Sequence, residues 1–125
     1  MSSSSDILKK IKDEEIEYLD LRFTDPRGKL QHVSILGDGV DEDLLDDGFM
    51  FDGSSIAGWK SIDQSDMKLA PDCSSSYVDP FYAEKTLCIH CNVAEPDTGE
   101  FYNRDPRSTA VKAENYLKSS GVGDI

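Results

Sequence analysis

IEYLDLRFTDPRGKLQHVSIL, residues 16–36, is the stretch of the sequence that decides the fold. In its first part, Ile16 to Thr24, apolar residues return at every second position, which is typical of a half-buried strand. Asp25 to Gly28 then has Pro at the second and Gly at the fourth position of a tight turn. The alternation resumes from Lys29 to Leu36. Strand, turn and strand together predict a β-hairpin.

Short helices are expected on both sides of this hairpin. The serine leader is followed by a helix that runs to about Glu15, with one of the serines or Asp6 as its cap and a narrow apolar stripe along one side. The acid-rich stretch Asp41 to Asp47 predicts a second helix, which Gly48 stops.

The second half of the chain holds one clear strand. Thr86 to Val93 alternates strictly between two faces. Before it, the region from Phe49 to about Tyr82 is rich in Gly, Pro and Ser, and only Met67 to Ala70 indicates a short strand. We therefore expect a long irregular region there, and irregular regions of that length are often functional.

A final helix is expected after the clear strand. Asp105 is a good cap and Pro106 suits the first helical position, so the helix runs from there to about Lys118. The sequence thus predicts one α+β domain to about Asn103, followed by a helix that belongs to another unit.

Composition excludes several classes of function. The 125 residues suit one ordinary domain, and 25 acidic against 13 basic residues give a net charge of −12. Such a charge repels phosphate backbones and anionic lipids, so we expect neither nucleic acid nor membrane as a partner. No apolar stretch is long enough to span a bilayer, and the N-terminus lacks the features of a secretory signal. Three cysteines do not suit a disulfide framework, so we expect a cytoplasmic protein.

The most informative motif is FMFDGSSIAGW, residues 49–59. Glycine lets the backbone turn sharply beside Asp52, and the hydroxyl and N–H groups that follow suit contact with a polar ligand. The same pattern also fits a capped turn in which Trp59 fills the core. The residues alone leave both interpretations open.

At this motif the sequence closely resembles the N-terminal domain of the bacterial type I glutamine synthetases. The resemblance covers essentially the whole chain after the serine leader, and several separate blocks agree in order and spacing. The matching blocks are Phe51 to Ile56, Gly58-Trp59, Ser65 to Met67, Gln31 to Val33, Leu69 to Asp72, and Tyr102 to Arg107.

The resemblance implies a fold and a place for the domain in a larger enzyme. The fold is α+β: a small, β-grasp-like mixed sheet with a short N-terminal helix, plus a C-terminal helix that begins the catalytic domain. The implied division is a leader and helix at 1–15, the β-grasp domain at 16–103, and the start of the catalytic domain at 104–125. In the family the enzyme is a homododecamer, and the N-terminal domain of one subunit closes the active site of its neighbour.

The resemblance also implies the site residues. Asp52 corresponds to the residue that binds ammonium and takes its proton, with Ser55 nearby as a further substrate-binding residue. Trp59 and Asp66 match positions near the same subunit boundary. A carboxylate suits this role because it attracts the cation and can accept its proton.

The family reaction joins ammonium to glutamate with ATP, through a γ-glutamyl phosphate. The metal and nucleotide sites lie in the catalytic domain, so Mg²⁺ or Mn²⁺ and ATP are expected for the full-length parent, while this 125-residue chain is expected to hold no cofactor and to be inactive alone. The alternative from another class is a free-standing acidic β-grasp module that binds another protein. The Asp52 loop distinguishes the glutamine synthetase domain from this alternative, because a generic protein-binding adaptor does not need such a loop.

Two apparent metal motifs are not convincing. On a strand, Cys88 and Cys91 point to opposite faces, so they cannot hold one ion together; we expect Cys91 to be buried and Cys88 to be more exposed. The acids of residues 41–47 fail the register of a calcium loop. His32, on the polar side of its strand, is expected to be a structural surface residue.

Overall fold

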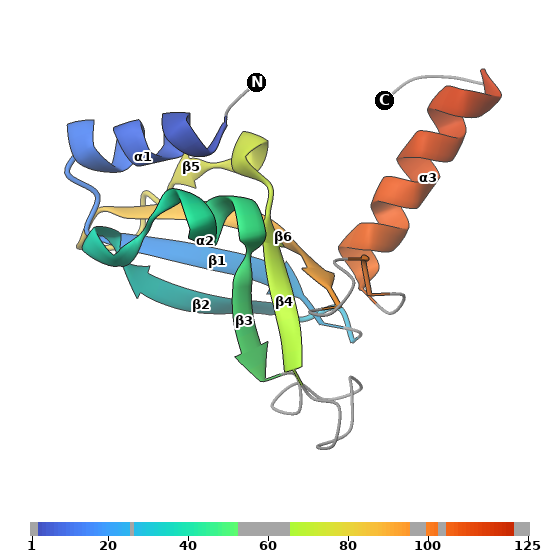
Figure 1. Cartoon of the computed structure of the whole chain (residues 1–125), viewed down its shortest axis with the longest axis horizontal. Helices are drawn as coiled ribbons and strands as arrows, with labels where there is room; N and C mark the ends of the chain where they lie inside the picture. The colour runs from blue at the N-terminus through green and yellow to red at the C-terminus, as the bar shows by residue number, and fades with distance from the viewer. Residues whose placement is uncertain (1–2, 26, 53–65, 96–99, 103–104, 122–125) are drawn as a thin grey trace.

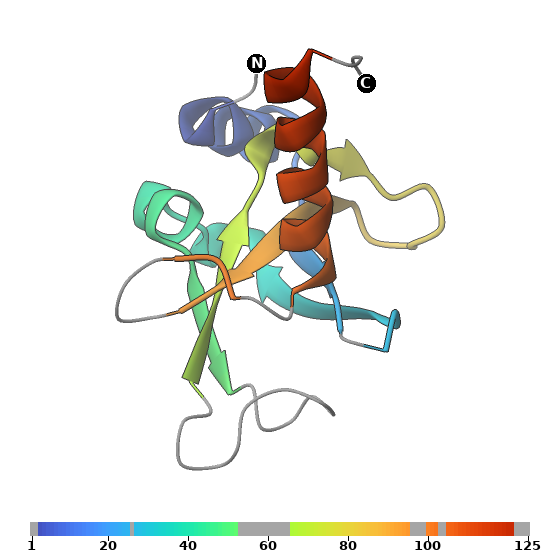
Figure 2. The same ribbon diagram turned by 90° about the vertical axis from the view of Figure 1, so that its right-hand side faces the viewer.

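The computed structural model describes residues 3–25, 27–52, 66–95, 100–102 and 105–121 (Figures 1 and 2). The six strands form one sheet: β1 Tyr18–Thr24, β2 Leu30–Leu36, β3 Phe49–Asp52, β4 Asp66–Pro71, β5 Tyr77–Val78 and β6 Thr86–Ala94. The helices are α1 Ser4–Asp13, α2 Glu42–Asp47 and α3 Pro106–Ser120, with 3-10 turns at Gly37–Gly39 and Cys73–Ser75.

The sheet is mixed, as predicted. Its strand order is β2-β1-β6-β4-β3, and β5 adds to β6 beside this path. β1 and β6 run parallel at the centre, while the pairs β1–β2, β3–β4, β4–β6 and β5–β6 are antiparallel. In Figure 1, α1 and α2 lie on the same side of the sheet, and α3 meets it only at one end of the helix.

The predicted hairpin is confirmed. β1 and β2 pair without a bulge from Tyr18↔Leu36 to Thr24↔Leu30. The alternation in β1 directs Leu19, Leu21 and Phe23 into the core, where each is at most 3% exposed. The turn closes with a 2.9 Å hydrogen bond from the Gly28 N–H to the Asp25 carbonyl.

The helix ends follow their capping residues. α1 begins at a capping box in which the Ser3 hydroxyl accepts from the Asp6 N–H and the Asp6 carboxylate accepts from the Ser3 N–H. α1 ends at Asp13, two residues before the expected limit. Asp41 caps α2, and Asp105 caps α3 with Pro106 in its first turn. The start of α3 is where the sequence predicted it, whereas the sequence left the α1 cap open among the serines and Asp6 and placed Asp41 inside α2.

The expectation of an irregular region from Phe49 to Tyr82 is wrong in part. Phe49–Asp52 is strand β3, β4 extends over Asp66–Pro71, and Tyr77–Val78 is strand β5. The two longer strands pair with each other in the register Phe49↔Leu69 and Phe51↔Met67. A strand of four residues carries too little periodicity to be recognised alone, and it is stabilised here by a partner about twenty residues later.

The expectation that Cys88 is the more exposed of the two strand cysteines is also wrong. Cys88 and Cys91 are both fully buried. β6 is the central strand, flanked by β1 on one edge and by β4 and β5 on the other, so eight of its nine residues are buried. The Cys88 thiol lies 3.8 Å from the Asp79 carboxylate on the face that the sequence suggested was open.

No helix in the described part of the chain combines the length and the apolar character that crossing a lipid bilayer requires.

Candidate functional site

The fold places two of the predicted site residues directly opposite each other. Asp52 ends β3, Asp66 begins β4, and the two are Cα partners in the last pair of that antiparallel ladder. Backbones of such partners lie about 4.5–5.5 Å apart.

The base of this hairpin is fixed by packing. Met67 and Leu69 of β4 are fully buried, and Phe49 and Phe51 of β3 pack against the same core. The Phe51 ring lies 5.2 Å from the Phe23 ring of β1, centroid to centroid, at an angle of 45°. Alternate residues of β3 thus point into the core, and this sets where the strand delivers Asp52.

Gly48 makes the approach of β3 to β4 possible. Its backbone has φ 98° and ψ 175°, a region that is essentially restricted to glycine. A Cβ atom at this position would lie 2.6 Å from the Leu69 carbonyl oxygen. The glycine that stops α2 is therefore also needed for the β3–β4 pairing.

Ser55 and Trp59 lie outside the described residues, as does the rest of the segment 53–65. The structure therefore brings together Asp52 and Asp66, and the roles of all four residues stay predictions.

A second polar group, which the sequence did not reveal, lies on the sheet face opposite α1 and α2. Asp20 of β1 is 0% exposed and accepts hydrogen bonds from Arg22 Nε at 2.8 Å, His32 Nδ1 at 2.8 Å and Ser34 Oγ at 3.0 Å. His32, expected to be a structural surface residue, is half-exposed and bonded in this way. Asp20 is a buried charge that is paired and fully hydrogen-bonded, as such charges must be.

Arg22 connects this group to β5 and the turn after it. Its Nη1 donates to the Tyr77 hydroxyl and its Nη2 to the Asp79 carboxylate, each at 2.7 Å. Burial alone would lower the pKa of Arg22, but the hydrogen bonds to Asp20 and Asp79 hold it above its ordinary value. The pKa of Asp79 lies below its usual value because its carboxylate accepts from the Phe81 N–H and from Arg22. Burial raises the pKa of the Cys88 thiol beside them.

The sequence showed only half of this arrangement. The alternation in β1 placed Asp20 and Arg22 on one face, and the hairpin brings β2 beside them, but Tyr77 and Asp79 lie 55 and 57 residues from Arg22 along the chain. The buried ion pairs tie three strands together, which is a structural role.

Two residues fix the start of α3 to the sheet. The Asp105 carboxylate, 0% exposed, accepts from the Val93 N–H at 2.9 Å and from the N–H and hydroxyl of Ser108. Arg107 donates to Asn92 and to Asp72, each at 2.7 Å. The direction in which α3 leaves the domain is thus set by its first turn.

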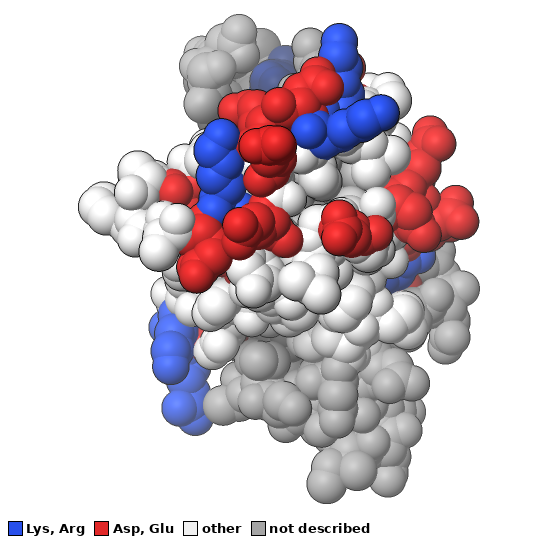
Figure 3. Space-filling model, turned by 90° about the vertical axis from the view of Figure 1, so that its left-hand side faces the viewer, with Lys and Arg blue, Asp and Glu red and all other residues white. Residues whose placement is uncertain are grey.

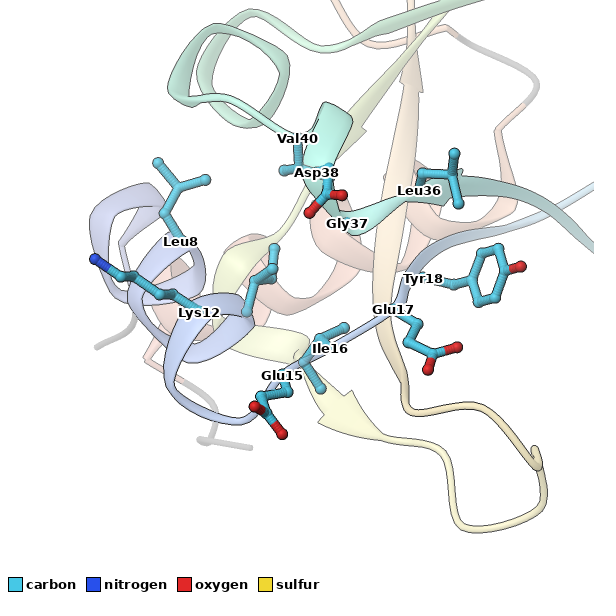
Figure 4. A pocket seen from close by; sticks show the side chains of 11 residues that line it. Leu8, Lys12, Glu15, Ile16, Glu17, Tyr18, Leu36, Gly37, Asp38 and Val40 are labelled. Carbon is cyan, nitrogen blue, oxygen red and sulfur yellow. The ribbon is translucent and has the colours of Figure 1, made fainter.

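A hollow of about 660 Å³ lies between α1, the start of β1 and the end of β2. Figure 4 shows Leu8, Lys12 and Ile16 on one side of it and Leu36 and Asp38 on the other. All of its lining residues fall within 8–18 and 36–40, so it does not include the Asp52–Asp66 pair. Among the described residues, no three His, Cys, Asp or Glu side chains are grouped to hold a metal ion.

Charge is unevenly distributed over the surface. Figure 3 shows Asp and Glu side chains gathered in the upper half of one face, with a few basic side chains among them and an uncharged area below. The exposed acids of the α2 region are Asp41, Glu42, Asp43, Asp46 and Asp47. Like charges on one face favour cationic partners over anionic ones.

A mixed sheet with parallel central strands and two helices on one face is the arrangement of a β-grasp domain. The family of the glutamine synthetase beta-Grasp domain matches residues 15–96, and this chain belongs to that family. It is 74% identical over its whole length to a glutamine synthetase of Cereibacter sphaeroides and 69% identical to one of Rhodobacter capsulatus. The chain spans only 27% and 28% of these relatives, about a quarter of their length.

The fold is also that of a solved structure. A Plasmodium falciparum glutamine synthetase superposes with a TM-score of 0.87 at 24% identity, over 97% of this chain and 23% of that one. The expected β-grasp fold is therefore confirmed.

Proposed function

We propose that this chain is the N-terminal part of a glutamine synthetase, the ligase that makes glutamine from glutamate and ammonium with ATP. The proposal rests on the family membership and on 74% identity with a glutamine synthetase along the entire chain. In this proposal the β-grasp domain of one subunit completes the active site of the neighbouring subunit in a homododecamer, and residues 104–125 begin the catalytic domain.

Asp52 is the proposed ammonium-side residue, with Ser55 beside it and Trp59 and Asp66 at the subunit boundary. The observation that supports it is the Asp52↔Asp66 pair at the end of the β3–β4 ladder. Two acidic residues that are backbone partners at one end of a hairpin suit a cationic ligand, and ammonium is such a cation.

The chemistry assigned to Asp52 is attraction and proton transfer. Ammonium has no lone pair and cannot attack an acyl group until it loses a proton. The carboxylate holds the cation and accepts one of its protons, which leaves ammonia with a free lone pair. The ammonia then forms the C–N bond at the acyl phosphate of glutamate, phosphate leaves, and a second N–H proton is lost to give the amide. Mg²⁺ or Mn²⁺ and ATP are assigned to the remaining sequence of the parent, which this chain does not include.

The test uses the full-length parent carrying Asp52→Asn. This change keeps the shape and an acceptor oxygen but removes the charge. Loss of a positioned acid–base group typically costs about 10²–10⁴-fold in rate. The loss should fall on the ammonium-dependent step, while ATP and glutamate binding change little. Asp43→Asn on the exposed surface of α2 removes the same unit charge and is the matched control.

Mixed assemblies test the position of the site between subunits. Asp52→Asn chains and chains disabled in the catalytic domain are each inactive, but mixed rings contain junctions that pair an intact Asp52 with an intact catalytic domain. Partial activity should return in such rings. Full activity of the Asp52→Asn enzyme, or no recovery in rings shown to be mixed, would contradict the proposed role.

The 125-residue chain alone should show no γ-glutamyl transfer or ATP-dependent ligation. Ligation by the pure chain, above a control preparation of the Asp52→Asn chain, would contradict the assignment of the nucleotide site to the rest of the parent.

A further inference from the structure

The strand β2 has an edge that the described part of the chain leaves unpaired. β2 is the outermost strand of the sheet and pairs only with β1 among the described residues (Figure 1). Natural edge strands are usually protected by lysines, prolines, bulges or short length. β2 has seven residues, LQHVSIL, without Lys or Pro, and its pairing with β1 has no bulge.

The hydrogen-bonding groups of this edge follow from the pairing with β1. The Lys29 carbonyl accepts from Asp25, and the Gly37 N–H donates to Glu17, so these odd-numbered residues direct their backbone toward β1. Along an antiparallel strand, successive residues direct their backbone N–H and C=O groups toward opposite edges of the strand. The even-numbered residues therefore direct their N–H and C=O groups away from β1. They are Leu30, His32, Ser34 and Leu36.

The side chains of these four residues are all exposed, on the sheet face opposite α1 and α2. The two leucines are at the ends, with Leu30 51% and Leu36 62% exposed. Val33 and Ile35, on the other face, are only half-buried. The strand is therefore incompletely covered on both faces as well as along its edge.

The pattern of β2 is complementary to itself. A two-fold axis through Val33 sets Leu30 opposite Leu36 of a second copy and His32 opposite Ser34. In this register every even-numbered residue faces another even-numbered residue, so all outward N–H and C=O groups of both edges meet partners. Val33 faces Val33 of the second copy. This pair forms no hydrogen bonds, because the N–H and C=O groups of Val33 are directed toward β1.

The distribution of charge favours association through the β2 edge over association through the rest of the surface. Each copy carries a net charge of −12, and the helix side holds exposed acids. Two copies repel each other there, whereas β2 contains no acidic or basic residue other than His32. A second copy therefore meets least repulsion along this edge.

We propose that two copies of this 125-residue chain associate through their β2 edges, antiparallel about Val33, to form one continuous sheet. The contact is isologous, so it closes at two copies. The leucine pairs at its ends bury apolar surface that is exposed in the single chain.

Cross-linking tests the register. A Val33→Cys chain, in a Cys73→Ser background, places two thiols on the axis, where Cα atoms about 4.5 Å apart are within disulfide range. Gln31→Cys in the same background is the control, because Gln31 faces Ile35 and its own copy lies about 13 Å away along the strand. Under mild oxidation with diamide, the Val33→Cys chain should form covalent dimers at least about tenfold faster.

Charge variants test the contact without touching the core. Leu30→Lys/Leu36→Lys places like charges opposite each other twice and should weaken dimerisation, measured by sedimentation equilibrium, about tenfold or more. Leu30→Lys/Leu36→Glu places opposite charges at the same pairs and should restore it. Phe81→Lys, at a side chain 93% exposed and distant in sequence, should leave it unchanged. Higher salt should tighten the wild-type dimer because it screens the net repulsion.

Three results would overturn the proposal. The first is a wild-type chain that stays monomeric up to about 1 mM at physiological salt. The second is a Phe81→Lys effect as large as that of the double lysine variant, which would indicate association through exposed aromatic residues. The third is equal cross-linking of the Val33→Cys and Gln31→Cys chains.

Discussion

Replacing Gly48 by alanine should separate β3 from β4, whereas the same change at Gly28 should not. Both glycines have positive φ, 98° at Gly48 and 86° at Gly28. An alanine in such a conformation costs about 1–3 kcal/mol of stability. Only Gly48 is also crowded: its Cβ would lie 2.6 Å from the Leu69 carbonyl oxygen and 2.9 Å from Lys68, while a Cβ at Gly28 meets nothing within 4 Å.

The magnitude follows from adding these costs. Forcing extra atoms into a packed site costs about 1–3 kcal/mol beyond backbone strain. Because the Leu69 carbonyl belongs to the backbone, the clash is relieved only if the two strands move apart. We expect Gly48→Ala to lower the free energy of unfolding by about 2–6 kcal/mol and Gly28→Ala by about 1–3 kcal/mol. At about 4 °C per kcal/mol, the corresponding losses in Tm are about 8–24 °C and 4–12 °C.

Urea titration followed by circular dichroism measures both variants, and amide hydrogen exchange locates the effect. In Gly48→Ala, exchange should accelerate in β3 and β4 before β1 and β2, because the clash lies between the first two strands. Equal losses of stability in the two variants would refute the argument from crowding. So would unchanged exchange in β3 and β4.

Two further predictions concern buried carboxylates. The Phe81 N–H and Arg22 hold the pKa of Asp79 in the folded state below its ordinary value near 3.8. The Asp79 carboxylate therefore contributes its full stabilisation above pH 3.8, and this stabilisation is lost as the pH falls through the lower pKa of the folded state. The urea midpoint of Asp79→Asn should therefore fall less between pH 7 and pH 2 than that of the wild type; parallel curves would contradict this. Asp105→Ala removes a helix cap and leaves the Val93 N–H buried without its acceptor, which should cost about 2–4 kcal/mol of unfolding free energy. Asp105→Asn keeps an acceptor oxygen and should therefore lose less unfolding free energy than Asp105→Ala. If Asp105→Ala loses less than about 1 kcal/mol, the expectation is wrong and water replaces the carboxylate.

The candidate site divides between what was readable in the sequence and what was not. The motif around Asp52 was recognisable as a loop beside an acid, because glycine and hydroxyl residues after an apolar run have local meaning. That Asp66 lies directly opposite Asp52 was not readable, because the β3–β4 register is set by packing of Phe51 and Met67 in the core. The Asp20 group was missed for the same reason.

The sequence by itself determined the elements whose causes are local. Alternation over seven residues, with Pro and Gly in the turn, specified the β1–β2 hairpin, and the cap Asp105 followed by Pro106 specified where α3 begins. Only the tertiary structure decided that β6 is the central strand, and Cys88 is buried for that reason. Only the tertiary structure made a strand, β3, from four residues that show no clear periodicity. These features depend on hydrogen bonds and side-chain packing between segments distant in sequence, whose energies exist only once the sheet has assembled.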